Sequence, residues 1–81
     1  MDQTSFLDVA IVTPQGVLFD GKAHSVILPG EQGFFEILIN HKPIVSRLFT
    51  GQIVIDDQRT ISIRRGVARA AKNQVLAVVE S

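Results

Sequence analysis

The apolar residues of this chain fall in short runs, and a turn signal closes each run within about ten residues. Between Thr60 and Arg64, Ile61 and Ile63 alternate with polar side chains, which is the period of a strand with one buried face. No longer window carries apolar residues at helical spacing. The predicted strands are Asp8–Val12, Val17–Phe19, His24–Leu28, Phe34–Leu38, Ile44–Phe49, Gln52–Ile55, Thr60–Arg64, Val67–Ala71 and Val75–Val79.

Turn residues separate these runs. Thr13–Gly16 has the composition of a type I turn, Asp20–Gly21 interrupts the second run, and Pro29–Gly33 reads as a five-residue loop. Asp56–Arg59 is typical of a hairpin loop, and Lys72–Asn73 of a turn before the last strand. We therefore predict one domain over residues 1–81, an all-β, flattened β-sandwich of short, mostly antiparallel strands with little or no helix.

The size and composition of the chain point to a partner. A hydrophobic content of 46% is ample for a core and excludes disorder. A chain this short nevertheless buries only roughly 60% of the surface that its unfolded form exposes. Because there is no cysteine, disulfides and thiolate metal sites are impossible, so we expect a binding partner to supply further stability.

Charge is divided unevenly along the chain, although the net charge is zero. Residues 1–40 carry five acids against one lysine, and residues 41–81 carry seven bases against three acids. Most of these charges are expected to pair within the domain, while one or two arginines from a basic patch at Arg64, Arg65 and Arg69 face an acidic partner. Neutral charge without Tyr or Trp argues against nucleic acid.

Neither a signal peptide nor a transmembrane segment is predicted. No apolar run approaches the roughly 18–20 residues that span a bilayer, and the first ten residues, MDQTSFLDVA, carry two acids and no base. The sequence therefore predicts a soluble, cytosolic protein that reaches a membrane only through a partner.

The two histidines are the candidates for chemistry. His24 and His41 lie far apart in sequence, without a G-x-S-x-G or H-E-x-x-H motif, and no glycine pattern precedes a helix as in a phosphate loop. We therefore expect structural or interface roles for both, with no catalytic residue, metal or cofactor. The alternative is a biotinyl- or lipoyl-like carrier domain with Lys72 on a hairpin tip, although Ala-Lys-Asn lacks the usual Met-Lys-Met or Asp-Lys-Ala flanks.

Four segments together resemble a known family, in order and over almost the whole chain. They are VAIVTPQGVLFDG, HSVILPGEQGFFEIL, NHKP and RRGVARAAKNQVLAVV. The chain is similar to the N-terminal β-sandwich domain of the epsilon subunit of F-type ATP synthases. In NHKP, His41 and Pro43 match the family's G-H-x-P loop.

The chain departs from the family at five points. Asn40 and Arg65 replace glycines, and we expect Asn40 to keep its turn by accepting a positive φ, while Gly66 remains. Glu36 and Ile39 replace a glycine and a proline, which predicts a more strand-like approach to His41. The chain also ends at Ser81, before the helical hairpin of the longer family form, so we expect a naturally short version rather than a truncated one.

The resemblance implies a non-catalytic rotor component that couples proton translocation to ATP synthesis. It implies a peripheral position on the cytoplasmic face of the energy-coupling membrane, with membrane contact only through the complex, and no cofactor. Carried over by position, the residues toward the gamma subunit are Thr13, His41, Ser46 and Arg64. Those toward the ring of c subunits are Glu31, Gln32, Gly33 and Phe34, with Phe34 either a contact or part of the core. Asn40, Pro43 and Gly66 are structural loop positions.

Overall fold

A computed structural model describes residues 5–81, and this part of the chain consists of strands and turns without a helix. The strands are β1 (Leu7–Thr13), β2 (Gly16–Ala23), β3 (Ser25–Gly30), β4 (Gly33–Leu38), β5 (Ile44–Leu48), β6 (Gly51–Ile55), β7 (Arg59–Ile63), β8 (Arg65–Ala71) and β9 (Gln74–Glu80). The all-β prediction is confirmed. Residues 5–81 accordingly contain no helix long and apolar enough to cross a membrane.

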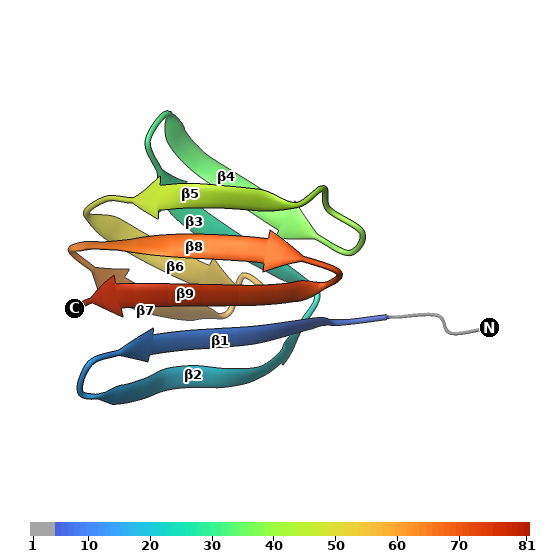
Figure 1. Cartoon of the computed structure of the whole chain (residues 1–81). Helices are drawn as coiled ribbons and strands as arrows, with labels where there is room; N and C mark the ends of the chain where they lie inside the picture. The colour runs from blue at the N-terminus through green and yellow to red at the C-terminus, as the bar shows by residue number, and fades with distance from the viewer. Residues whose placement is uncertain (1–4) are drawn as a thin grey trace.

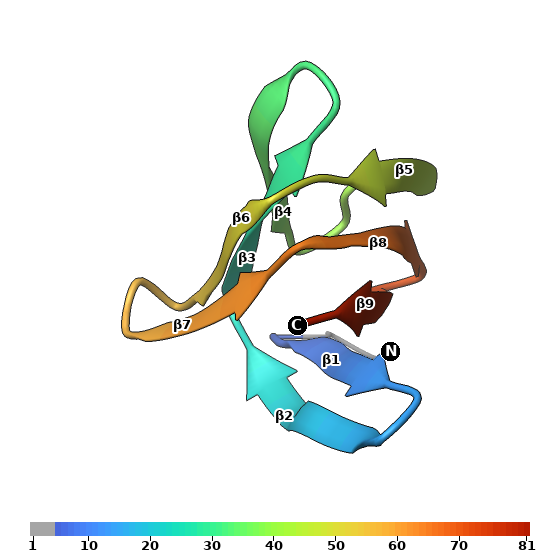
Figure 2. The same cartoon turned by 90° about the vertical axis from the view of Figure 1, so that its left-hand side faces the viewer.

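The strands form two layers (Figure 1). The front layer has the order β2-β1-β9-β8-β5, and the back layer holds β7, β6, β3 and β4. Strands β1 and β9 run parallel, whereas all other neighbours are antiparallel. The two layers are joined at one edge, where Leu48 at the end of β5 lies opposite Gly30 of β3. Away from this edge the layers diverge (Figure 2).

The core lies between the layers and is entirely apolar in the described residues. Strand β9 shows the cause, because Val75, Ala77 and Val79 point inward while their neighbours are exposed. Burial of each Val, Leu or Ile side chain contributes about 1.5–3 kcal/mol, which makes this interface the main source of stability. The largest fully buried side chains are Leu7, Val9, Ile11, Val26, Leu28, Ile37, Leu48, Ile53 and Val79.

Several strands are longer than predicted. The predicted break at Asp20–Gly21 is wrong, because β2 continues to Ala23 in register with β1. The predicted five-residue loop at Pro29–Gly33 is also wrong, since Gly30 pairs with Gly33 and only two residues form the turn. In both places pairing with a neighbouring strand overrides the turn preference of Gly, Pro and Asp. The sequence of one segment does not show which strand will pair with it. His24 lies in a bend between β2 and β3 rather than in a strand.

Two hairpin turns use residues with positive φ. Lys72 and Asn73, at φ 53° and 61°, form the two-residue turn between β8 and β9, in the conformation of a type I′ turn. Asp56, at φ 54°, begins the β6–β7 loop, and its Oδ1 accepts bonds from the backbone N–H groups of His24 (2.7 Å) and Ser25 (3.0 Å). This carboxylate ties the β6–β7 hairpin to the junction of β2 and β3.

Candidate interaction surfaces

The two histidines take no part in a common site. The His24 ring lies against Phe6 with ring centroids 4.8 Å apart and the planes tilted by 45°, whereas His41 lies in the β4–β5 loop with its Nδ1 2.7 Å from the Lys42 carbonyl oxygen. No group of three or more His, Asp or Glu side chains in residues 5–81 is arranged to hold a metal ion. The exposed surfaces are therefore the candidate functional sites.

A network of backbone and amide bonds fixes the corner that carries His41. The His41 N–H donates to the Leu38 carbonyl (3.1 Å), and Asn40 has the predicted positive φ of 65°. The Asn73 side chain accepts from the Asn40 N–H (2.6 Å) and donates to the Asn40 side chain (3.3 Å). The Asn73 carbonyl also accepts the Asp8 N–H (2.9 Å). The corner is thereby joined to the β8–β9 turn and to the start of β1.

The approach to this corner is only partly strand-like. Glu36 lies within β4 opposite Ile27, as predicted. The prediction is wrong for Ile39, which lies in the turn after β4 and packs half-buried against the core. An aliphatic side chain at this position adds to the core where a proline would only restrict the backbone.

The structure separates the four positions predicted to face gamma. Thr13 ends β1 and Arg64 precedes β8, and both lie at the end of the front layer where β9 finishes, since the Arg64 N–H donates to the Glu80 carbonyl (2.7 Å). His41 lies at the opposite end, beyond strands of seven residues that span roughly 20 Å. Ser46 lies between them on β5, half-buried, opposite Ala68.

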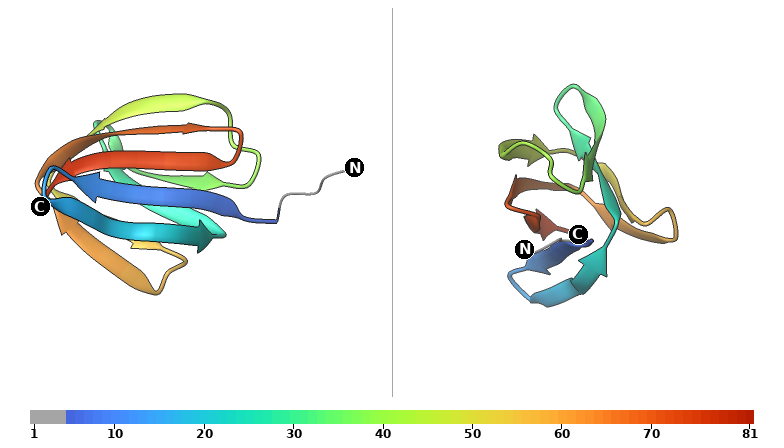
Figure 3. Two further views of the ribbon diagram at one scale, coloured as in Figure 1. Left: turned by 60° about the horizontal axis from the view of Figure 1, so that its bottom comes forward. Right: turned by 90° about the vertical axis from the view of Figure 1, so that its right-hand side faces the viewer.

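The residues predicted to face the c-ring form the tip of the β3–β4 hairpin. Glu31, Gln32, Gly33 and Phe34 are all exposed, and the hairpin projects beyond the rest of the fold (Figures 2 and 3). Gly33 has φ 114°, a conformation that favours glycine. Phe34 is 66% exposed, which excludes it from the core and leaves it free for a contact.

The hairpin tip and Ser46 lie on the same cleft. It has a volume of about 440 Å³ and opens between the tip and β5, where the two layers diverge. Its walls are Glu31–Phe35 on one side and Ile44–Ser46 on the other. One predicted gamma contact therefore adjoins the predicted c-ring contacts.

One more surface carries several exposed aliphatic residues, and the sequence did not predict it. It is the solvent-facing side of β2, β1, β9, β8 and β5, which we call the outer face. Strand register places Val17, Val12, Val78 and Val67 in one row across four strands, and Arg47 of β5 continues the row. Val17, Val67 and Val78 are 63%, 49% and 48% exposed.

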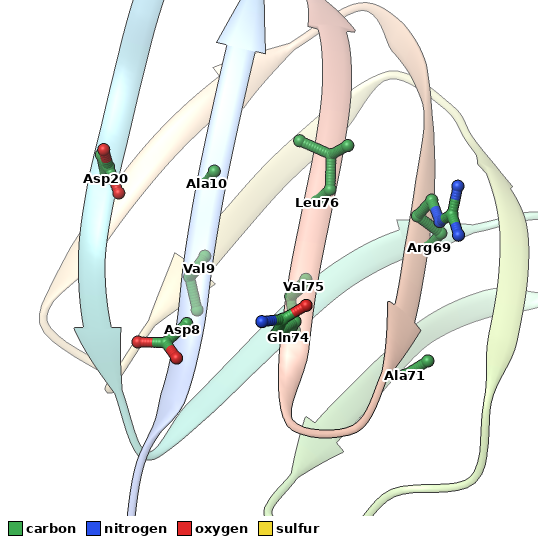
Figure 4. Close-up of a pocket in the computed structure, with 9 residues that line it drawn as sticks. All are labelled: Asp8, Val9, Ala10, Asp20, Arg69, Ala71, Gln74, Val75 and Leu76. Carbon is green, nitrogen blue, oxygen red and sulfur yellow. The ribbon is translucent and has the colours of Figure 1, made fainter.

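A second row crosses the outer face beside the valines. It runs from Asp20 on β2 through Ala10, Leu76 and Arg69 to Val45 on β5. Figure 4 shows its first four residues projecting from adjacent strands around a shallow depression of about 370 Å³. An acidic edge, an aliphatic centre and a basic residue thus follow one another across the sheet.

One ion pair lies at each end of the strands that form the outer face. Lys22 Nζ lies 2.9 Å from Asp8 Oδ1 at one end, and Arg65 Nε lies 3.2 Å from Glu80 Oε1 at the other. The described residues form no further ion pair, so the charges within the two rows are left without a partner in this part of the chain.

The outer face had a signal in the sequence. Val75–Val79 is apolar at every position instead of alternating, and such a run indicates a strand covered on both sides. One set of its residues fills the core, and Leu76 and Val78 belong to the outer face.

Lys72 is exposed on its hairpin turn, as predicted, but its flanking residues give it no feature of a modified lysine.

Comparison with known proteins identifies relatives of the whole described fold. The family described as "ATP synthase, Delta/Epsilon chain, beta-sandwich domain" matches residues 6–81. The ATP synthase epsilon chain of Sulfurimonas denitrificans is 36% identical over 80 residues, covering 94% of this chain and 62% of that protein. The epsilon chain of Nitratiruptor sp. is 38% identical over 78 residues, covering 91% of this chain and 60% of that protein. The chain thus spans about 60% of the length of these relatives.

Solved structures share the fold at low identity. A chain of the Euglena gracilis mitochondrial ATP synthase, solved with OSCP, F1 and c-ring, superposes with a TM-score of 0.86 and 11% identity, over 100% of this chain and 54% of that one. A chain from the central stalk and c-ring of the Tetrahymena thermophila mitochondrial ATP synthase gives a TM-score of 0.77 and 15% identity, over 100% of this chain and 67% of that one.

Proposed function

This chain belongs to the family of the ATP synthase delta/epsilon chain beta-sandwich domain, and we propose that it serves in the rotor of an ATP synthase as the sandwich of an epsilon chain. In this role it performs no chemistry. It binds the gamma subunit and the c-ring and helps to couple proton translocation to ATP synthesis elsewhere in the complex. The match over residues 6–81 is the observation that carries the proposal.

The gamma contacts are proposed at Thr13, His41, Ser46 and Arg64. Support comes from the rigidity of their backbone, because the His41 corner is bonded to Asn73 and the Arg64 backbone is bonded to the end of β9. Their separation means that gamma contacts both ends of the front layer, so the interface extends over the length of the strands.

The c-ring contact is proposed at Glu31, Gln32, Gly33 and Phe34. Support comes from the projection of the hairpin and from the exposed Phe34 ring, since a large exposed aromatic side chain commonly marks an interface. Through this tip and gamma the chain is held at the cytoplasmic face of the energy-coupling membrane, without direct contact with lipid.

Binding to gamma tests the proposal. The chain, co-expressed with the gamma subunit of its source organism, is expected to co-purify with it as a stable pair. His41→Glu and Ser46→Glu should weaken the pair, because each places a charge in a desolvated contact, whereas Ser62→Glu on exposed β7 is the matched control. Circular dichroism establishes that each variant is folded.

Two results would count against the proposal in different ways. If the parent chain has no affinity for gamma, the rotor function itself is wrong. If the parent binds and both variants bind as tightly, only the assignment of His41 and Ser46 is wrong.

A further inference from the structure

We propose that the free edge of β4 is a docking site for an extended polypeptide strand that carries a basic residue between two apolar ones. The strand pairs antiparallel with Phe34–Leu38 and places its basic side chain opposite Glu36. Phe34 also belongs to the predicted c-ring contact, whereas Glu36 and Leu38 lie outside it. The inference does not depend on the rotor function.

The position of β4 in the sheet gives the first reason. Strand β4 lies at the edge of the back layer, and β3 is its only partner strand in the part of the chain that the structure describes (Figure 1). On β3, the Ser25 carbonyl oxygen accepts the Asp56 N–H (3.1 Å), and the Pro29 carbonyl oxygen accepts the Phe49 N–H (2.9 Å). Both of these carbonyl groups therefore point away from β4.

This pattern decides which backbone groups of β4 are free. Leu38 and Phe34 lie opposite Ser25 and Pro29, so they occupy non-hydrogen-bonded positions of the β3–β4 pair, and so does Glu36 between them. The N–H groups of Phe34, Glu36 and Leu38 accordingly point to the free edge, together with the carbonyl groups of Phe34 and Glu36. The Leu38 carbonyl oxygen accepts the His41 N–H (3.1 Å) and ends this row.

Strand β4 also carries few of the features that hinder pairing at a sheet edge. Such features are charged side chains, prolines and bulges. Strand β2 has Lys22 and a bulge, β5 has Arg47, and β7 has Arg59. Strand β4 has no basic residue, no proline and no bulge, and Glu36 is its one charged residue. It is therefore the edge most open to an added strand, and Glu36 selects which strand is added.

The side chains along the free edge define the chemistry of the partner. Phe34 and Leu38 are 66% and 50% exposed, and the exposed Glu36 lies between them on the same side of β4. Glu36 forms no ion pair with any residue in 5–81. Opposite charges and apolar pairs across neighbouring strands are favourable. A strand with a basic residue opposite Glu36 and an apolar residue two positions away on each side satisfies all three side chains.

A second copy of this chain fits the same edge poorly. Antiparallel pairing of two β4 strands that matches Phe34 with Leu38 puts the two Glu36 carboxylates directly opposite each other. Like charges at opposed positions are destabilising. A register moved by two residues places an apolar side chain opposite a carboxylate instead. Glu36 thus favours a strand with a basic residue over a second copy.

Titration of the isotope-labelled chain with capped peptides, followed by NMR, tests the proposal. The probes are Thr-Val-Thr-Lys-Thr-Val-Thr, its analogue with glutamate in place of lysine, and an analogue N-methylated at the lysine. The lysine peptide should bind roughly tenfold more tightly than the glutamate peptide, because an opposite charge replaces a like charge. It should also slow hydrogen exchange of the Phe34, Glu36 and Leu38 amides. The N-methylated peptide should not bind, because it cannot donate to the Glu36 carbonyl.

A charge reversal on the chain completes the test. Glu36→Lys should reverse the preference, so that the glutamate peptide binds more tightly than the lysine peptide by a similar factor. Asp20→Lys, which makes the same change at an exposed position of the edge strand β2, is the matched control and should keep the preference of the parent. Circular dichroism establishes that both variants are folded.

The outcomes separate this inference from the proposed function. If neither peptide slows exchange of these amides in the parent chain, the edge of β4 is not a docking site. Equal binding of the lysine and glutamate peptides, or an unchanged preference in Glu36→Lys, would show that Glu36 does not select the partner. If the same amides become protected as the concentration of the chain alone rises, the occupant is a second copy. The rotor function is tested by gamma binding and is unaffected by each of these results.

Discussion

Single residues explain how this chain tolerates its departures from the family sequence. Asn40, where the family resemblance implies a glycine, has a φ of 65°, and its bonds to Asn73 hold the turn in place. Arg65, at another position where the resemblance implies a glycine, has an exposed side chain that pairs with Glu80. The Asn40 substitution could be judged from sequence because a positive φ is a local property, whereas the Arg65–Glu80 pair depends on the pairing of β8 with β9.

Gly66 could not be replaced in this way. A Cβ atom on Gly66 would lie 2.5 Å from the Val78 carbonyl oxygen and 2.8 Å from a Val79 methyl group. Such a contact forces β8 and β9 apart. The Gly66 prediction as a structural position rested on resemblance, and the structure gives it a steric reason.

We expect Gly66→Ala to lower the free energy of unfolding by about 1–3 kcal/mol, the usual cost of overpacking. Gly21→Ala is the matched control, because a Cβ there would meet only the Phe19 ring, at 3.4 Å. Urea unfolding followed by circular dichroism measures both. Equal midpoints for the two variants would show that β8 and β9 adjust freely.

The strands were predictable in number and approximate place, but their ends and partners were not. Alternation and turn residues marked all nine strands. Strand β2 passes through Asp20 and Gly21 because β1 supplies partners for them, which is a property of the pair. The parallel pairing of β1 with β9 likewise joins segments more than sixty residues apart in sequence, and no local pattern specifies it.

The Asp56 side chain joins the β6–β7 loop to the junction of β2 and β3. Asp56 accepts two backbone N–H groups at the β2–β3 junction, so its removal leaves two donors without their partner. Asp56→Ala should lower the free energy of unfolding by about 1–3 kcal/mol. Asp56→Asn retains an acceptor oxygen and should cost less, as measured by urea unfolding. If the two variants are equally stable, the bonds contribute nothing to the junction.

The molecule as a whole presents two exposed surfaces, the β3–β4 hairpin tip and the outer face, and the sequence predicted the first better than the second. The place of the hairpin tip was predictable because Gly30 and Gly33 mark it, although the length of its turn was not. The outer face was only partly predictable. The uninterrupted apolar run Val75–Val79 is a signal for it, but the rows of Val12, Val67 and Val78 come from strands distant in sequence and exist only after the sheet has formed. Under the proposed function, the hairpin tip meets the c-ring and the predicted gamma contacts meet gamma, which puts the chain between the two.

The absence of cysteine allows this placement to be measured by single-site crosslinking in ATP synthase purified from membranes. Arg64→Cys at a proposed gamma contact and Gln32→Cys on the hairpin tip each introduce a unique thiol, and Thr60→Cys on β7 is the control. We predict a covalent product with gamma from Arg64→Cys, a product with the c subunit from Gln32→Cys, and none from Thr60→Cys. Incorporation of the chain without a gamma or c product from either site would contradict its placement between the two.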